Sequence, residues 1–456
     1  MAPFCVVRKD FELVKPSIPT PSEVLSFSTI DNDVNMETIS PTIFVCQSII
    51  TTNNNNNNAE EDPAKLIKQT LSEVLVHYYP LAGRLKRHSH DGRLRLTCNT
   101  NGVPFLEATA DCTLSSLSYL DDLNFEIAKE FVSTSTPADF IDEKTGYAPL
   151  IMQVTKFSCG GFTIGFGLSH SVSDGFGAAQ FFQAIAEVSK GKKLSVKPVW
   201  ERERLVGSPI KEPIKVDNGL FPAKSPYLPF SDVVDECFYV KSESIKRLKE
   251  SLAKEMNSVH CSLTTFEVLA AYVWRARLRA LKLNPDGITT LFFATGLRKV
   301  INPPLPEGYY GNAFLTSAVE ITGKELDEKP LSEVANLIKE KKKDVFDNNY
   351  IRKSIDVLET ELVTRQNEKI KATGALMAVT DWRNLGLVVE EIGFGWKVVN
   401  VTTLQWECFG SVDLCTFLPP PKSDPSMKNA VGILVSLPRP AMTKFKEEMN
   451  DLMVIN

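Results

Sequence analysis

The chain has 456 residues, of which 43% are hydrophobic and 23% charged, with a formal net charge of −5. This length favours two domains, and the negative charge argues against nucleic-acid binding, which needs a basic face opposite the phosphates. No apolar run is long enough to predict a membrane span, and the charged N-terminus lacks the apolar segment of a secretory signal, so we expect a cytoplasmic protein.

The first half of the chain predicts alternating helices and strands. Pro63 begins a pattern in which apolar residues recur at helical spacing. Two apolar runs, Leu150–Phe157 and Phe162–Ser169, are joined by S-C-G-G and predict a β-hairpin. After Asp174 the spacing becomes helical again and continues to Gly191, a candidate C-cap.

The second half continues the alternation after a proline-rich stretch. Residues 206–230 are interpreted as a crossover between an N-terminal domain, 1–205, and a C-terminal domain, 231–456. The longest helical pattern of the second half has Ser262 as its candidate N-cap. Because strands and helices interleave in both halves, we predict an α/β protein with two layered domains.

One short segment, Gly165–Gly177, places His170 and Asp174 where a predicted strand gives way to a helix. A histidine between small residues can accept and return a proton at neutral pH, which suits a general base. Asp174 could then orient the imidazole, or it could pair with an arginine and hold the turn together. The alternative is a buried, hydrogen-bonded histidine followed by an aspartate that caps the helix, and the five-residue pattern alone favours that alternative. No second His or Cys lies near, and the nine cysteines form no C-x-x-C pair, so neither a metal site nor a disulfide framework is predicted.

Five blocks spread over nearly the whole chain resemble the plant acyl-CoA-dependent acyltransferases of the BAHD family. The blocks are Y-Y-P-L-A-G-R-L at 78–85, H-S-V-S-D-G at 170–175, P-V-W-E-R-E at 198–203, the block Leu297–Phe314 and G-F-G-W-K at 393–397. Several of them resemble most closely the branch that holds taxane and alcohol acyltransferases. The resemblance implies a chloramphenicol-acetyltransferase-like fold, in which two similar-sized domains with mixed β-sheets enclose an active-site channel.

The resemblance also implies an activity, the transfer of an acyl group from acyl-CoA to a hydroxyl, or less readily an amine, of a plant specialised metabolite. His170 would be the general base, and no covalent acyl-enzyme is needed. Thr380 and Trp382 would stabilise the oxyanion, with packing at a strand end as the alternative for both. Asp174 would pair with Arg298 and support the site rather than act in the chemistry.

The last block departs from the family's D-F-G-W-G. Gly393 and Lys397 replace its aspartate and glycine, whereas Trp396 remains as structural support of the site. Restoring the aspartate should raise or barely change stability unless Gly393 has a positive φ. The departure leaves an inactive family member, binding a metabolite or a protein, as the alternative function. A carrier-protein condensation domain is a third hypothesis, but Ser169 stands where such domains usually have a second histidine.

We expect a monomer that uses acyl-CoA as co-substrate, with no permanently bound cofactor and no metal. The lysines of K-G-K-K at 190–193 and K-E-K-K-K at 339–343 are candidates for contacting the phosphates of CoA. Such charge runs are more often solvated helix faces. The acyl group and the acceptor depend on pocket shape, which the sequence does not specify.

Overall fold

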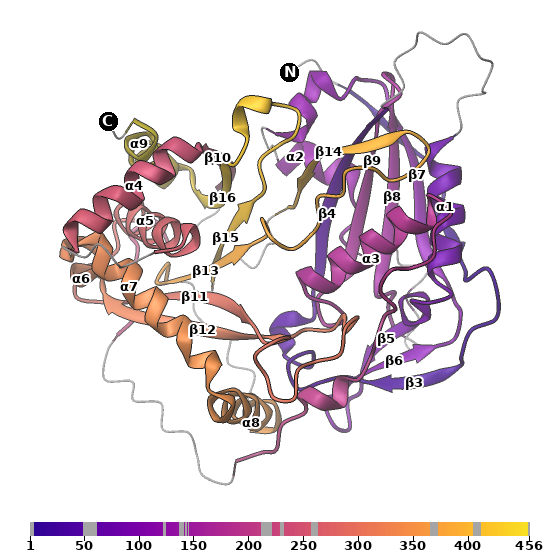
Figure 1. Ribbon diagram of the computed structural model, residues 1–456, viewed down its shortest axis with the longest axis horizontal. Helices are drawn as coiled ribbons and strands as arrows, with labels where there is room; N and C mark the ends of the chain where they lie inside the picture. The colour runs from indigo at the N-terminus through magenta and orange to yellow at the C-terminus, as the bar shows by residue number, and fades with distance from the viewer. Residues whose placement is uncertain are drawn as a thin grey trace.

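Strands from both halves of the chain form two lobes in the computed structural model (Figure 1). The structure describes residues 4–48, 62–121, 125–135, 141, 144, 146–210, 221–228, 232–256, 263–364, 373–404 and 412–454. Within these residues the strands form three sheets, of seven, six and three strands. The α/β class with two layered lobes is therefore confirmed.

The seven-stranded sheet of the first lobe is mixed. Its order is β1 (Val6–Arg8), β7 (Val103–Ala110), β8 (Leu150–Phe157), β9 (Phe162–Ser169), β4 (Ile39–Ser48) and β14 (Trp396–Thr402), with β2 (Glu12–Val14) also paired to β7. Strands β7 and β8 are parallel, and β8 and β9 form the predicted hairpin. Two long helices lie against this sheet (Figure 1), α1 (Pro63–Val74), which Asp62 caps, and α3 (Gly175–Val188).

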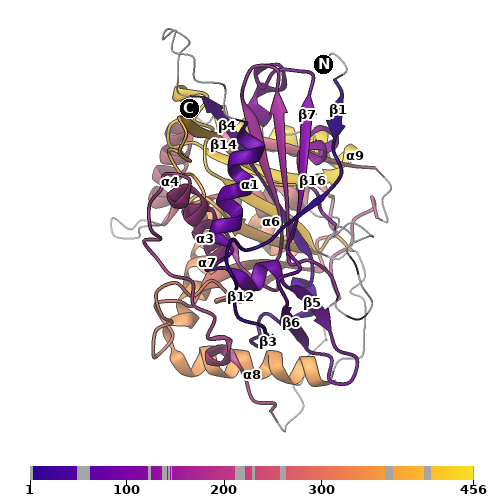
Figure 2. The same cartoon turned by 90° about the vertical axis from the view of Figure 1, so that its right-hand side faces the viewer.

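A small sheet and two further helices complete this side of the molecule. They are β3 (Glu23–Ser26), β6 (Leu94–Cys98), β5 (Arg84–Arg87), α2 (Phe125–Ala128) and α8 (Asn348–Thr364). Figure 2 shows α8 below the small sheet, and the Glu359 carboxylate of α8 pairs there with Arg93. A helix from the second half of the chain is thus fixed to the first lobe.

The six-stranded sheet of the second lobe is also mixed. Its order is β10 (Val233–Val240), β16 (Val431–Pro438), β15 (Asp413–Leu418), β13 (Leu376–Asp381), β11 (Ile288–Gly296) and β12 (Phe314–Thr322). The helices of this lobe are α4 (Ser242–Glu255), α5 (Thr265–Ala280), α6 (Gly323–Glu328), α7 (Leu331–Lys341) and α9 (Arg439–Val454). Across the described ranges, none of the helices combines the length and hydropathy that a bilayer span requires.

Helix α5 starts at a capping box rather than at the expected cap. Thr264 accepts a hydrogen bond from the Glu267 backbone N–H, and the Glu267 carboxylate accepts one from the Thr264 backbone N–H. The expected N-cap, Ser262, lies outside the described residues.

Strand β14 crosses the expected domain boundary. It comes from the second half of the chain, yet it pairs antiparallel with β4 in the first sheet. Trp396, its first residue, is buried against Phe162 with ring centroids 4.8 Å apart. The second half of the chain therefore contributes to both lobes, and the division at 206–230 stays a prediction.

Candidate active site

His170 follows the last residue of β9, a strand whose eight residues are all buried. Its backbone N–H donates a hydrogen bond to the Thr38 carbonyl, 2.8 Å away, and its ring meets Phe314 edge-on at 6.2 Å. The side chain is partly exposed. The imidazole therefore lies at the C-terminal end of a central strand of the first sheet, where it meets Phe314 of the second lobe.

Asp174 caps α3 and pairs with Arg298. Its Oδ1 atom accepts hydrogen bonds from Arg298 Nη2 at 2.7 Å and Gly177 N at 3.0 Å. Its Oδ2 atom accepts from Arg298 Nη1 at 2.8 Å and Ala313 N at 3.1 Å. The helix cap and the ion pair, two alternatives on the sequence alone, are therefore both present. Such a bidentate pair is charge-assisted and fixes the turn that follows His170.

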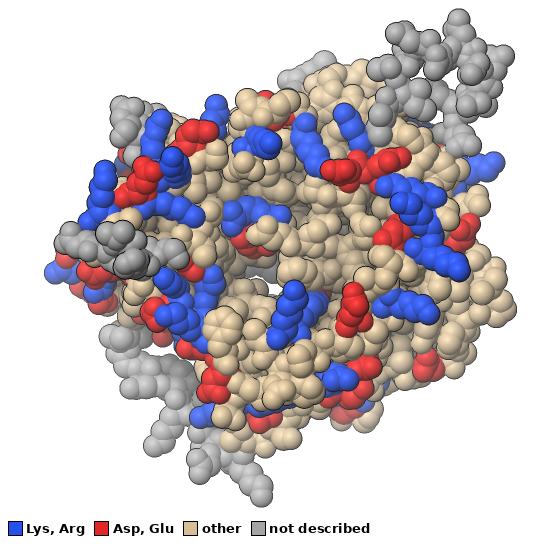
Figure 3. Space-filling view, in the orientation of Figure 1, with Lys and Arg blue, Asp and Glu red and all other residues tan. Residues whose placement is uncertain are grey.

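A cavity of about 610 Å³ lies between the two lobes, within the usual size range of ligand sites. Figure 3 shows the surface hollowed near the centre of one face, with Lys and Arg side chains beside the opening. Strands and helices of both lobes contribute to its wall. The lining includes the aromatic side chains of Phe166, Phe176, Phe266, Phe293, Phe314 and Trp382. His170 is in the same wall, so an enclosed ligand can reach its ring.

The structure brings most of the residues expected at the site to this cavity. Thr380, on β13, and Trp382, just after it, line the cavity together with His170. The Trp382 backbone N–H donates to the Phe417 carbonyl at 2.8 Å, which holds this strand end in place. Trp396 is elsewhere, in the core of the first lobe.

Burial lowers the pKa of His170 from its ordinary value of 6.5, and this effect outweighs the opposing effects of Asp174, Asn312 and Asp31. The imidazole is therefore neutral at neutral pH, the state in which it can accept a proton.

One wall of the cavity carries two basic side chains, each of which pairs with a carboxylate, Lys342 with Glu267 and Arg383 with Asp381. Lys342 and Arg383 line it, and so does the N-terminus of α5 at Thr264 and Thr265. Burial, followed by the charge of Arg383, lowers the pKa of nearby Lys249. Cationic side chains and a helix N-terminus both favour anions, so a phosphate group at this wall would compete with Glu267 and Asp381 for the two cations.

The other candidate lysines are not part of this wall. Lys341 pairs with Asp344 at 2.7 Å, and Lys343 pairs with Glu340 at 2.7 Å. Lys342, the candidate that lines the cavity, also pairs with Glu267 at 2.8 Å. In the 190–193 run, Lys190 approaches Glu391 at 3.9 Å, away from the cavity lining.

The G-F-G-W-K block lies at the C-terminal end of α3, whereas His170 precedes its N-terminal end. Gly393 has a φ of +75°, and a Cβ there would lie 2.5 Å from the Ser189 carbonyl oxygen. The Ser189 hydroxyl donates to the Ile392 carbonyl at 2.5 Å and so ties the loop to the helix. The block is therefore an attachment between β14 and α3, and neither Gly393 nor Lys397 lines the cavity.

Sequence reasoning missed a second buried carboxylate–guanidinium pair beside His170. Asp31 and Arg202 are in contact, and Asn312 bonds both Asp31 and the His170 backbone. Arg202 is in the P-V-W-E-R-E block and Asn312 in the Leu297–Phe314 block, so the resemblance contained a signal for both. Nothing in the local sequence marks Asp31, which lies in an ordinary polar turn.

The described residues contain no group of three or more His, Cys, Asp or Glu side chains that could hold a metal ion.

Comparison with known proteins agrees with this layout. The profile of the Transferase family matches residues 5–452. A spermidine coumaroyl-CoA acyltransferase of Arabidopsis thaliana is 44% identical over 98% of this chain and 95% of that protein. A taxadien-5-alpha-ol O-acetyltransferase of Taxus chinensis is 34% identical over 97% of this chain and 95% of that protein. The crystal structure of vinorine synthase, 23% identical, covers 98% of both chains with a TM-score of 0.73 and shares the fold.

The chain thus has the two-lobed α/β fold of vinorine synthase, with His170 in a cavity between the lobes. The chain belongs to the Transferase family, that of the BAHD acyltransferases.

Proposed function

We propose that this chain transfers an aromatic acyl group from acyl-CoA to an amine of a polyamine, with His170 as general base. The observation that carries the proposal is the 44% identity to a spermidine coumaroyl-CoA acyltransferase, against 34% to an O-acetyltransferase. An aromatic cavity lining suits an aromatic acyl group. The hydroxyl acceptor favoured by the sequence blocks is the second candidate, which the O-acetyltransferase relative supports.

The reaction begins with a neutral amine, because only its lone pair can attack. The amine nitrogen attacks the thioester carbonyl carbon while the His170 imidazole removes a proton from that nitrogen. The carbonyl oxygen becomes an oxyanion, and we assign its stabilisation to Thr380 and Trp382, two residues of the cavity lining. When the carbon–sulfur bond breaks, the imidazolium returns the proton to the CoA sulfur. The products are an amide and free CoA, and no acyl-enzyme forms.

The co-substrate would be bound at the basic wall. We assign the phosphates of CoA to the region of Lys342, Arg383 and the start of α5. A crystal structure of Fusarium sporotrichioides TRI101 complexed with coenzyme A and T-2, 17% identical with a TM-score of 0.73, shares the fold. CoA is a substrate here, so no resident cofactor is required.

The test is an assay of the purified chain with coumaroyl-CoA and acetyl-CoA against spermidine and a diol of similar length. Free thiol release gives the rate, and mass spectrometry identifies the product. We expect N-acylated spermidine from coumaroyl-CoA. Ester formation from the diol alone would replace this proposal with the hydroxyl acceptor. Binding of CoA without thiol release for any pair would favour the inactive alternative.

The role of His170 is tested by His170→Ala, which should lower kcat by about 10²–10⁴-fold, the usual contribution of a general base. Circular dichroism should show an unchanged fold. A folded His170→Ala variant with the wild-type rate would remove the base from this mechanism. A cytoplasmic location and a monomeric state stay predictions, and analytical ultracentrifugation tests the latter.

A further inference from the structure

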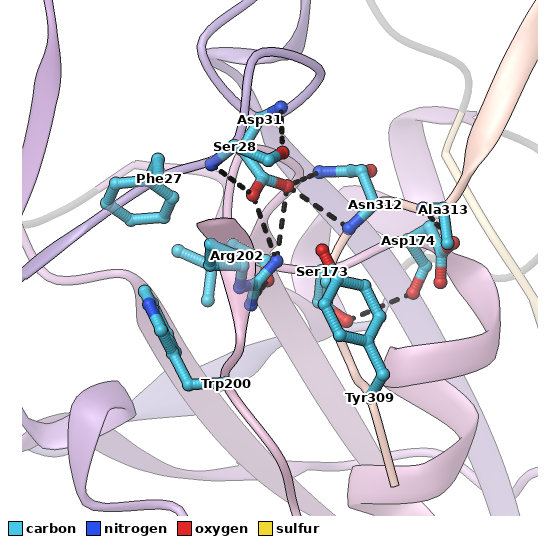
Figure 4. Close-up of polar contacts among 12 residues, drawn as sticks. Phe27, Ser28, Asp31, Ser173, Asp174, Trp200, Arg202, Tyr309, Asn312 and Ala313 are labelled. Atoms are coloured by element: carbon cyan, nitrogen blue, oxygen red, sulfur yellow. Dashed lines mark hydrogen bonds and ion pairs between the residues drawn. The ribbon is translucent and has the colours of Figure 1, made fainter. Parts of the chain in front are cut away.

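Asp31 is a fully buried carboxylate outside the cavity lining. Figure 4 shows Asn312 and Arg202 directed at it from two sides. Asp31 Oδ1 accepts hydrogen bonds from Asn312 N at 3.1 Å and Asn312 Nδ2 at 2.8 Å, and Oδ2 accepts one from Ser28 N at 3.1 Å. Arg202 Nη1 lies 3.2 Å from Oδ1 and 3.1 Å from Oδ2. The charge and the acceptor sites of Asp31 are thus engaged by residues far apart in sequence.

The same two partners also hold the backbone around His170. Asn312 Nδ2 donates a hydrogen bond of 2.7 Å to the His170 carbonyl. Arg202 Nη2 donates one of 2.7 Å to the Val172 carbonyl. An amide and a guanidinium can each serve two acceptors, and here each joins Asp31 to the turn that carries the histidine.

The surroundings leave the Arg202 guanidinium little freedom. It lies 4.2 Å above the centre of the Trp200 ring and is almost fully buried. A Cβ at position 311 would lie 1.6 Å from Arg202 Nη1, so Gly311 is required by this close approach. Burying such a pair costs desolvation and does not by itself stabilise a fold, whereas it can specify one arrangement.

We propose that Asp31 is a positioning residue for the acyl-transfer reaction: through Asn312 and Arg202 it fixes the backbone of residues 170–172 and so the direction of the His170 imidazole. This inference rests on the proposed role of His170 as general base. Asp174 fixes the other end of the same turn, because it accepts a hydrogen bond from the backbone N–H of Ala313, the residue that follows Asn312. The turn is therefore held at two points against one segment of the second half of the chain.

Asp31 also acts on the imidazole through its charge. Two carboxylates act on the charge of His170, Asp174 at the start of α3 and Asp31 in the turn after β3. Each is paired with an arginine, Asp174 with Arg298 and Asp31 with Arg202. Both carboxylates raise the pKa of His170, although burial lowers it more. Loss of the Asp31 charge should therefore lower the pKa of His170 further. A residue with a purely structural role would not shift the titration of His170 in this way.

The experiment compares Asp31→Asn with a matched control, Asp413→Asn. Asp413 is a buried carboxylate paired with Arg277 in the second lobe, and it is not part of the cavity lining. We expect Asp31→Asn to lower kcat per folded molecule by about 10²-fold, as misplacement of a catalytic group does, with the KM for acyl-CoA unchanged. The titration midpoint of the His170 imidazole, followed by NMR, should move to lower pH. Asp413→Asn should lower stability and leave kcat and the His170 titration midpoint in place.

A second variant keeps the test decisive if Asp31→Asn does not fold. Asn312→Ser removes the hydrogen bond to the His170 carbonyl and leaves the Asp31–Arg202 pair intact, and it should also lower kcat with KM unchanged. A folded Asp31→Asn protein with wild-type kcat and an unmoved His170 titration, or a folded Asn312→Ser protein with wild-type kcat, would overturn the inference. Full activity of His170→Ala would instead overturn the proposed function, so the two failures are distinct.

Discussion

Removal of the Asp174 charge should destabilise the protein strongly, because Asp174 faces only donors. Its two oxygens accept from Arg298, Gly177 N and Ala313 N. In Asp174→Asn the new amide group must direct its hydrogens at one pair of these donors. Breaking a buried pair by removing one partner costs about 3–5 kcal/mol, and we expect the lower end because the Arg298 side chain is 22% exposed.

A double-mutant cycle isolates the contribution of the pair itself. With Asp174→Asn, Arg298→Met and the double variant, we expect a coupling energy of about 2 kcal/mol, within the range for directly bonded residues. The pair Asp232–Arg439 is a matched control, since it also has two hydrogen bonds, at 2.6 and 3.1 Å. Its side chains are 57% and 65% exposed, so water should screen it and leave a much smaller coupling.

Urea unfolding followed by circular dichroism gives the free energies, and kcat is measured on the same preparations. Asp174→Asn should also lower kcat, because the turn after His170 loses its attachment. Equal coupling in the two pairs would refute the reasoning, since it would mean that burial adds nothing to the Asp174–Arg298 contact. Additivity of Asp174→Asn and Arg298→Met would show that the contact does not contribute to stability.

Three further outcomes are expected. Because burial lowers the pKa of His170, its imidazole should titrate below pH 6.5 when it is followed by NMR, and stability from the neutral imidazole, present above that pH, should be lost as the pH falls through the folded-state pKa; a titration midpoint above 6.5 would contradict this. Gly393→Asp should lower stability by about 2 kcal/mol, because aspartate is strained at positive φ and its Cβ would clash with the Ser189 carbonyl. The kcat per folded molecule should be unchanged, and a melting temperature equal to or above that of the wild type would contradict this prediction. Dialysis against a chelator should leave the rate unchanged, because acyl transfer here needs only a base and oxyanion donors; recovery of a lost rate with added zinc would contradict that mechanism.

The elements around the site could be predicted because their signals are local. The change from alternating to helical spacing after Asp174 reflects β9 and α3 directly, and Gly160 at positive φ fits the predicted hairpin. The two readings of Asp174, helix cap and ion-pair partner, could not be separated on sequence because one carboxylate has enough acceptor sites for both.

Features that depend on contacts between residues distant in sequence could not be predicted from the sequence. Asp31 gains its significance from Arg202 and Asn312, 171 and 281 residues away. Strand β14 comes from the second half of the chain and joins the first sheet by pairing with β4. The residue spacing within either strand does not reveal this pairing. The clash expected in Gly393→Asp depends on the Ser189 carbonyl, which the end of α3 brings close to position 393.

The block Leu297–Phe314 contains no catalytic residue, yet it holds two carboxylates beside the site in place. The backbone N–H of Asn312 binds Asp31, and the next N–H, that of Ala313, binds Asp174. Asn312 and Ala313 come directly before β12, and their neighbouring N–H groups point at two different carboxylates. A one-residue insertion before Asn312 would exchange these directions and break both contacts at once. The length of this segment, and not only its composition, is therefore part of what holds His170 in place.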